Sequence, residues 1–156
     1  MSSFLNLTIR PATEDDIPAV VELFAADEVG GHGDTTDAAA LPDYIAAFER
    51  ISASSHETLY VAELDGTVAG TFQTTITTSM TGRGSSSIIV EAVQTRADLR
   101  GRGIGAAMIA YAVEDAKKRG LRLVQLTSNK KRTDAHRFYE RIGFAPSHLG
   151  FKMRLK

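Results

Sequence analysis

Residues 100–106 read Arg100-Gly101-Arg102-Gly103-Ile104-Gly105-Ala106, with three glycines that alternate with larger residues between an expected strand and a long expected helix. Glycine lets the backbone turn sharply and come close to a ligand. The N–H groups at a helix start, aided by the helix dipole, suit an anion. The run therefore predicts a loop whose backbone groups hold a diphosphate. A tight turn that binds nothing is the alternative.

Two other phosphate-binding loops fit this run less well. A P-loop needs Lys and then Ser or Thr after its last glycine, and neither follows Gly105. A dinucleotide-binding G-x-G-x-x-G loop that begins at Gly101 would need a glycine at the position of Ala106. The pattern therefore meets neither nucleotide fingerprint.

The residues on both sides of the loop predict the strand and the helix that it joins. Residues 88–93, Ile-Ile-Val-Glu-Ala-Val, have the composition of a strand. Residues 103–119 are apolar over most of their first half, and Gly120 then suits the left-handed position that ends a helix. A helix of this composition is expected to pack against a sheet.

The first half of the chain predicts antiparallel strands and two short helices. Residues 5–10 alternate apolar and polar up to Pro11, as in a half-buried strand. Apolar residues recur at helical spacing over 17–24 and 44–51, on either side of a glycine-rich loop at 30–34. Residues 59–73 form a hairpin around Asp65-Gly66, and threonines extend its second strand to residue 78.

The second half predicts a fifth strand at 121–127, a helix capped by Thr133, and a last strand at 151–155. An antiparallel run of strands followed by a strand-helix-strand unit implies a mixed, mostly antiparallel sheet with helices on its faces. The predicted class is α+β. A length of 156 residues fits one domain that covers residues 1–156.

Composition excludes several kinds of partner. The net charge of -1 gives no overall positive field for a nucleic acid backbone. The chain has no cysteine, which suits reducing cytoplasm. Its first residues do not resemble a secretory leader, and no stretch reaches the ~20 apolar residues of a membrane span. We therefore expect a soluble cytoplasmic protein that binds neither nucleic acid nor membrane.

Two motifs carry a family resemblance. Residues 91–108 resemble the main motif of the GNAT family of N-acetyltransferases, with Arg100, Gly103 and Gly105 at its defining positions. Asn129 and residues 135–144, which contain Ala135, Tyr139 and Gly143-Phe144, resemble the later motif of the same family. The resemblance covers most of the chain. It implies transfer of an acetyl group from acetyl-coenzyme A to an amine.

The resemblance also implies where acetyl-coenzyme A lies. The sheet of the family is splayed between the fourth and fifth strands, and the pantetheine arm inserts there, which in this chain is the gap between Val93 and Leu126. Backbone groups of Val93 and Thr95 would bond the pantetheine, with the Val93 N–H facing the thioester oxygen. Arg100, Gly101, Arg102, Gly103, Ile104, Gly105 and Ala106 would hold the pyrophosphate. Asn129 and His136 complete the implied cofactor site.

The acceptor is less defined. Residues 130–134 and the ending Ser147-His148 resemble a subset that includes aminoalkylphosphonate acetyltransferases, which implies a small amine. The loops at 29–41 and 80–87, together with the first two helices, are expected to set the choice of acceptor. The resemblance also allows a homodimer.

Acetyl transfer needs a base for the amine and an acid for the leaving thiolate. Glu91 is the predicted base, because alternation along a strand puts it on the face of Val93. Its alternative role is a carboxylate that pairs with a nearby cation or caps the end of the sheet. Tyr139 is the acid that the resemblance implies, and its alternative role is a core tyrosine bonded to a backbone carbonyl.

Other charged groups are weaker candidates. His148 shares with His136 the choice between the cofactor, the acceptor and an ordinary surface position. His32 has no second histidine at ligand spacing, so no metal is expected. Lys130-Lys131-Arg132 suits phosphates or a solvated surface equally. Two other functions compete with catalysis: a non-catalytic acyl-coenzyme A binding module that acts as a sensor, and a nucleotide or nucleic-acid binding domain.

Overall fold

The structure, a computed structural model, describes residues 6–28 and 32–156. Leu5 of the first predicted strand and residues 29–31 of the predicted acceptor loop lie outside these residues. The chain divides into two compact units, which we name the sheet unit (residues 1–126) and the C-terminal unit (residues 127–156).

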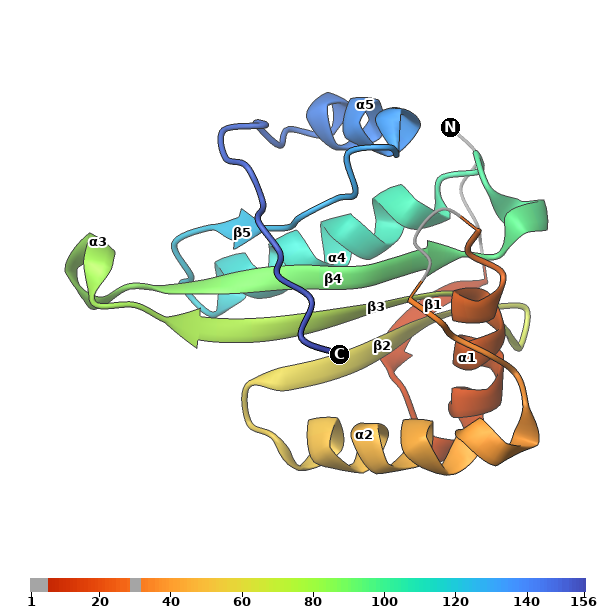
Figure 1. The fold of residues 1–156 in the computed structure, drawn as a ribbon. Helices are drawn as coiled ribbons and strands as arrows, with labels where there is room; N and C mark the ends of the chain where they lie inside the picture. The colour runs from red at the N-terminus through yellow and green to blue at the C-terminus, as the bar shows by residue number, and fades with distance from the viewer. Residues whose placement is uncertain (1–5, 29–31) are drawn as a thin grey trace. The chain divides into compact units, whose positions relative to one another are not determined.

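In the part of the chain that the structure describes, five strands form one sheet in the order β1-β2-β3-β4-β5 (Figure 1). The strands are β1 (Leu7–Pro11), β2 (Glu57–Leu64), β3 (Thr67–Thr78), β4 (Ser86–Thr95) and β5 (Val124–Gln125). The first three pairings are antiparallel, and β5 pairs with β4 in parallel. The predicted α+β fold with a mixed, mostly antiparallel sheet is confirmed.

The described residues also form helices and short 3-10 turns. They are α1 (Ile17–Ala25), α2 (Leu41–Ala53), α3 (Thr81–Gly84), α4 (Ile104–Lys118) and α5 (Thr133–Arg141), with 3-10 turns η1 (Glu14–Asp16), η2 (Ala38–Ala40) and η3 (Ala97–Leu99). Gly82 and Arg83 have positive φ inside α3, so this short element is a turn within the predicted loop 80–87. The long predicted helix is α4, and Gly120 follows it with the expected left-handed φ of 69°.

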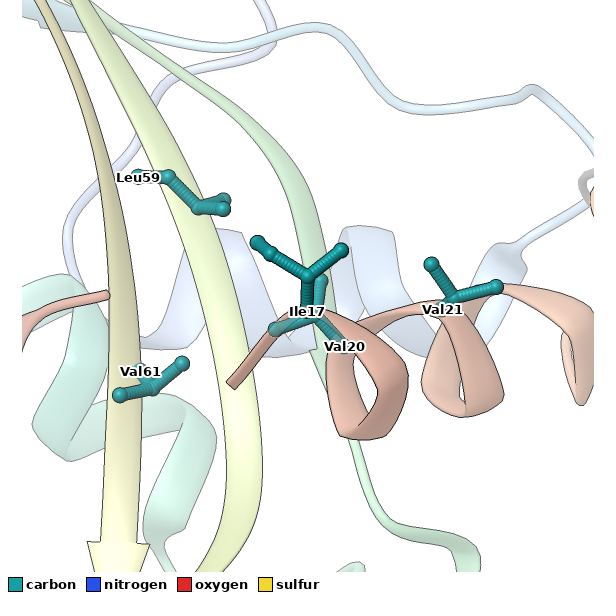
Figure 2. Close-up of a cluster of buried hydrophobic side chains, with 5 residues drawn as sticks. All are labelled: Ile17, Val20, Val21, Leu59 and Val61. Carbon is teal, nitrogen blue, oxygen red and sulfur yellow. The ribbon is translucent and has the colours of Figure 1, made fainter. Parts of the chain in front are cut away.

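The sheet buries apolar side chains on both faces because residues alternate along each strand. On one face, Leu59 and Val61 of β2 pack with Ile17, Val20 and Val21 of α1 (Figure 2). On the other face, the ring of Tyr60 lies 5.3 Å from that of Tyr111 on α4. Helices α1 and α4 therefore cover opposite faces of the sheet.

The hairpin forms as its sequence predicts. Leu64 pairs with Thr67, and the two residues between them have positive φ, 51° at Asp65 and 84° at Gly66. This geometry matches the right-handed twist of the flanking strands. The hairpin places β3 in the centre of the sheet, where it pairs with β4 over most of its length.

A half-buried ion pair ties β1 to the turn before α1. Arg10 Nη1 lies 2.7 Å from Asp16 Oδ2, and the same oxygen accepts a hydrogen bond of 2.8 Å from the Thr13 N–H. The Arg10 guanidinium, followed by the Thr13 N–H, holds the pKa of Asp16 below its ordinary value against the opposing effect of burial. A carboxylate with these partners stabilises the fold only while it is ionised.

We expect Asp16→Asn to lower the free energy of unfolding at pH 7 by about 2 kcal/mol, since hydrogen bonds to charged groups are lost. Because the folded pKa is depressed, the contribution is complete above the unfolded pKa of about 3.9 and disappears as the pH falls through the folded value. Urea titrations at several pH values measure the difference. The exposed neighbour Asp15→Asn is the control and is expected to change stability little. A difference in stability that does not shrink as the pH is lowered below the unfolded pKa would contradict the prediction.

Three predictions about the last third of the chain are wrong in detail. The fifth strand is limited to Val124 and Gln125, instead of 121–127. Residues 151–155 form no strand among the described residues. Thr133 is the first residue of α5, not its cap, and no side chain caps that helix. A period-two pattern predicts a strand only where a neighbouring strand supplies hydrogen bonds, and sequence does not identify that neighbour.

No helix within residues 6–28 and 32–156 combines the length and the apolar character that crossing a bilayer requires.

Candidate functional site

A β-bulge interrupts β4 beside the predicted thioester site. Gln73 pairs with Glu91 and Thr71 pairs with Gln94, so two steps along β3 correspond to three along β4. Ala92, within the extra length, has a φ of 53°, which is rare for a residue with a side chain. A bulge leaves one residue outside the ladder and redirects the backbone. The backbone next to Val93 is therefore released from pairing with β3.

The bulge also affects the prediction that Glu91 is the base. Alternation predicts that Glu91 and Val93 share a face, but an extra residue between them breaks the alternation. Glu91 is exposed, and Thr75 Oγ1 donates to its Oε1 at 3.4 Å across β3 and β4. No cation pairs with Glu91 among the described residues of the sheet unit. Its assignment as the base remains a prediction.

On the edge of β4 that pairs with β5, the pairing ends just before the bulge. Within the described residues of the sheet unit, β5 pairs with β4 only at Ile88–Val124 and Ile89–Gln125. From Val90 to Thr95, backbone groups on this edge have no partner in β5. The two strands thus separate where the resemblance requires a gap, and Val93 and Thr95 both lie on the open stretch.

The glycine loop follows β4 and the 3-10 turn η3. Leu99 and Ile104 are buried, whereas the four residues between them are exposed. Gly101 and Gly103 have φ values of 75° and 93°, which strain any residue with a Cβ. The loop is therefore anchored at both ends, and its exposed backbone takes a conformation that depends on glycine.

The start of α4 can bind an anion. Gly103 is the N-cap, and no side chain accepts from the first turn. The first helical bond runs from the Ala107 N–H to the Gly103 carbonyl at 3.0 Å, so the N–H groups of Ile104, Gly105 and Ala106 have no helical acceptor. Left-handed glycines next to a helix start form a concave set of N–H groups that suits phosphate.

Arg100 links this loop to β4. Its Nε donates to the Thr95 carbonyl at 3.4 Å, and the Arg96 N–H donates to the Ala69 carbonyl of β3 at 2.8 Å. The bond from Arg100 holds its guanidinium near the end of β4. The structure therefore connects Thr95, two residues after Val93, to the start of the loop 100–106.

Two contacts that sequence analysis missed organise the segment around the predicted acceptor loop. Gln94 Nε2 donates to Asp27 Oδ2 at 2.9 Å, which ties the residues after α1 to the strand next to Val93. The Tyr44 hydroxyl donates to Asp34 Oδ1 at 2.7 Å and accepts from the Thr35 N–H at 3.3 Å. Gln94 and Asp27 are 67 positions apart, and no local pattern pairs them.

The C-terminal unit contains the other predicted cofactor residues, and two of them contact each other. His136 Nε2 lies 2.9 Å from the Asn129 carbonyl oxygen. Asn129 Oδ1 accepts from the Lys131 N–H at 2.9 Å, which forms a tight turn before α5. These bonds give both residues a structural role in the turn. Their contact with a cofactor remains a prediction.

Tyr139 lies in the apolar part of the C-terminal unit. Its ring contacts Phe138 and Phe144, with centroids 5.3 and 5.9 Å away. Burial raises the pKa of its hydroxyl, and Arg132 opposes that effect weakly. Within the described C-terminal unit the hydroxyl makes no hydrogen bond. Its role as the acid remains a prediction. A tyrosine in this state keeps its proton at neutral pH and can donate it.

The weaker candidates have no shared site. His32 is exposed, and His148 Nδ1 lies 2.7 Å from the hydroxyl of the adjacent Ser147. The described residues contain no group of three His, Asp or Glu that could hold a metal. Two open hollows of the surface lie along α2, and Ala38 and Leu41 of the predicted acceptor loop line one of them. None of the predicted catalytic or cofactor residues lines either hollow.

Both the sequence and the fold match known proteins. The sequence matches the model of the acetyltransferase (GNAT) family over residues 17–144, a range that crosses from the sheet unit into the C-terminal unit. A crystal structure of a transcriptional regulator from Bacillus halodurans is 39% identical, with a TM-score of 0.92 over 96% of this chain and 100% of that chain.

Two further relatives are named as acetyltransferases. Aminoalkylphosphonate N-acetyltransferase from Salmonella typhimurium is 46% identical over 57 residues, which are 36% of this chain and 37% of the relative. The chain thus aligns with about a third of that protein's length. Glucosamine-6-phosphate N-acetyltransferase from Arabidopsis thaliana shares the fold, with a TM-score of 0.77 and 20% identity over 97% of this chain and 99% of that chain.

Proposed function

The chain belongs to the GNAT family of acetyltransferases, and from this premise we propose that it transfers the acetyl group of acetyl-coenzyme A to an amine of a small molecule. The observation that carries the proposal is the stretch of the sheet unit from β4 to the start of α4. It joins the bulge at Ala92, the open edge of β4 and the N–H groups at the start of α4. One ligand with a thioester, an extended arm and a diphosphate matches all three parts.

The proposed reaction is direct attack in a ternary complex. The amine nitrogen attacks the thioester carbon, and the Val93 N–H stabilises the oxygen that becomes negative. The carbon–sulfur bond then breaks, and the departing sulfur takes a proton from Tyr139 while the amine loses one to Glu91, directly or through water. The raised pKa of Tyr139 supports its role, because a protonated hydroxyl is needed.

Charge supports an amine acceptor. Residues 1–126 contain 17 acidic and 10 basic side chains, so the sheet unit carries a net charge of -7. Small amines are cations at neutral pH, and a negative surface raises their local concentration. The named activity of the Salmonella relative supports the same class of acceptor. We place the reaction in the cytoplasm because the chain has no cysteine.

A non-catalytic acyl-coenzyme A sensor is the second candidate. The observation that favours it is the 39% identical Bacillus halodurans chain, which is described as a transcriptional regulator. Both functions use the glycine loop and the open edge of β4. They differ in whether Glu91 and Tyr139 perform chemistry.

Calorimetric titration with acetyl-coenzyme A, followed by free-thiol release with a panel of small amines, separates the two functions. Binding with amine-dependent thiol release supports the transferase. Binding without release for any amine supports the sensor. No binding of acetyl-coenzyme A would contradict both.

The bond between Gln94 and Asp27 gives a test of the acceptor side. We propose that it holds the residues after α1 beside the acetyl group, where the amine enters. Gln94→Ala is expected to raise KM for the amine about tenfold, equivalent to about 1.4 kcal/mol. The Kd of acetyl-coenzyme A should not change. Steady-state kinetics and calorimetry measure the two quantities.

A charge-swapped pair serves as the control. Gln94→Glu alone places two carboxylates together and should also raise KM, whereas Gln94→Glu with Asp27→Asn restores a donor and an acceptor in reversed order. Recovery of KM in the double variant would assign the effect to this bond. Equal KM values in all variants would exclude it from acceptor binding.

A further inference from the structure

Gly70 of β3 leaves room for a side chain of α4. A Cβ added at Gly70 would lie 3.0 Å from both Sδ and Cε of Met108 and 3.1 Å from the Gln94 carbonyl oxygen. Nonbonded carbon atoms at their optimal separation are about 3.5–4.0 Å apart. Gly70 is not among the glycines with a positive φ, so the backbone conformation does not require glycine at this position. The packing therefore uses the absence of a side chain at residue 70.

Met108 has no space to move aside. It is 0% exposed, and Ile104 and Ala112, one helical turn before and after it, are each 1% exposed. The three side chains form the buried face of α4. Because protein interiors are close-packed, a methyl group at residue 70 would move the helix or the strand as well as the thioether. Gly70 therefore determines how closely α4 lies against β3.

The contact between Gly70 and Met108 joins the two regions of the sheet unit that we assign to acetyl-coenzyme A. Gly70 pairs with Thr95, whose backbone is assigned to the pantetheine arm. Met108 lies one turn after Ile104, the first residue of α4, whose N–H is assigned to the pyrophosphate. A ligand that bonds both regions at once needs the spacing between them to be held within about 0.5 Å. The packing of Met108 against Gly70 can hold this spacing.

We propose that Gly70 is a positioning residue for acetyl-coenzyme A, because the room that it leaves for Met108 sets the distance between the end of β4 and the first turn of α4. The inference rests on the proposed function, which assigns both regions to one ligand. A role in folding alone would weaken the binding of every ligand of the glycine loop. A role in spacing weakens only a ligand that uses both regions.

Two ligands separate these roles. Gly70→Ala is expected to raise the Kd of acetyl-coenzyme A about tenfold, since a small displacement leaves one of the two regions poorly placed. Adenosine diphosphate carries the diphosphate without the pantetheine arm, and its Kd should not change. Calorimetry measures the first Kd, and ligand-detected NMR measures the second. Equal effects on the two ligands, or no effect on acetyl-coenzyme A, would overturn the positioning role alone. A parent chain that binds no acetyl-coenzyme A would overturn the proposed function as well.

A substitution at Met108 tests the contact from its other side. Met108→Val lacks Sδ and Cε, and it therefore vacates the space that a methyl group at residue 70 enters. Gly70→Ala combined with Met108→Val should bind acetyl-coenzyme A as tightly as Met108→Val alone. The added methyl group has room in this double variant, so the comparison stands even where Gly70→Ala alone folds poorly. A double variant that binds about tenfold more weakly than Met108→Val would show that the two residues act independently, which overturns the proposal.

Val20→Ala controls for loss of stability. Val20 belongs to the buried cluster on the opposite face of the sheet (Figure 2), so its truncation lowers stability without touching the contact between Gly70 and Met108. Urea titrations compare the stability of Val20→Ala with that of Gly70→Ala. The Kd of acetyl-coenzyme A should match the parent value in Val20→Ala. An increase as large as in Gly70→Ala would assign the effect to stability and overturn the proposal.

Discussion

Gly103→Glu is expected to abolish acetyl-coenzyme A binding, with the Kd raised about 100-fold or more. Gly103 is the N-cap of α4 with a φ of 93°, and a Cβ added there would meet no atom within 4 Å. The new side chain therefore meets no packing obstacle, but it brings a carboxylate to the N–H groups that we assign to the pyrophosphate. Juxtaposed like charges cost several kcal/mol, and each 1.4 kcal/mol is a factor of ten in Kd.

A second glycine provides the matched control. Gly66 in the hairpin has a φ of 84° and also has no atom within 4 Å of an added Cβ. Gly66→Glu thus introduces the same charge and similar backbone strain, about 1–2 kcal/mol, away from the loop. It should lower stability and leave the Kd of acetyl-coenzyme A unchanged. Equal losses of binding in the two variants would attribute the effect to folding and remove the loop from the cofactor site.

Tyr139→Phe is expected to lower kcat about 100-fold, since a positioned general acid contributes at least this factor. The Kd of acetyl-coenzyme A should change little. The hydroxyl has no hydrogen-bond partner within the C-terminal unit, so its removal should barely affect stability. Single-turnover thiol release with a responsive amine gives the rate, and calorimetry gives the Kd.

The pH dependence adds a second measure of the same role. Burial raises the pKa of Tyr139, so the protonated acid persists until the pH exceeds the ordinary tyrosine value of about 10. Loss of rate on the alkaline side that is assigned to this acid should begin above that value and be absent in Tyr139→Phe. Tyr111→Phe on α4 is the control, and its rate should match the parent. An unchanged kcat in Tyr139→Phe would remove this residue from the chemistry.

Local patterns predicted most of the sheet unit. The hairpin at Asp65-Gly66, the helix that ends at Gly120 and the glycine loop all depend on φ values that only certain residues adopt easily, so their sequence reports their shape. The resemblance to the GNAT family is carried by the same kind of residue. The family match over 17–144 confirmed it.

Local sequence patterns did not predict the bulge at Ala92. Alanine does not favour a positive φ, and nothing in residues 88–95 indicates an extra residue relative to β3. The bulge exists because pairing with β3 fixes the strand on both sides of it. Its position matters for function, since it releases the backbone beside Val93 and changes the relation between Glu91 and Val93.

The hydrogen bond between Gln94 and Asp27 also depends on the tertiary fold. Both residues are polar and neither belongs to a motif, so only the fold that brings the end of α1 to β4 identifies them. For Tyr139, the resemblance identifies the residue, but its raised pKa follows from burial, which only the fold determines.

The sequence by itself determined the α+β class, the glycine loop and the family, because each of these depends on the conformational preferences of short segments. Only the tertiary structure decided where the bulge lies, which polar side chains meet, and that residues 151–155 form no strand within one described chain. Strand pairing and burial depend on a second segment that is distant in the sequence. A local pattern shows that a segment can pair, and the fold determines what it pairs with.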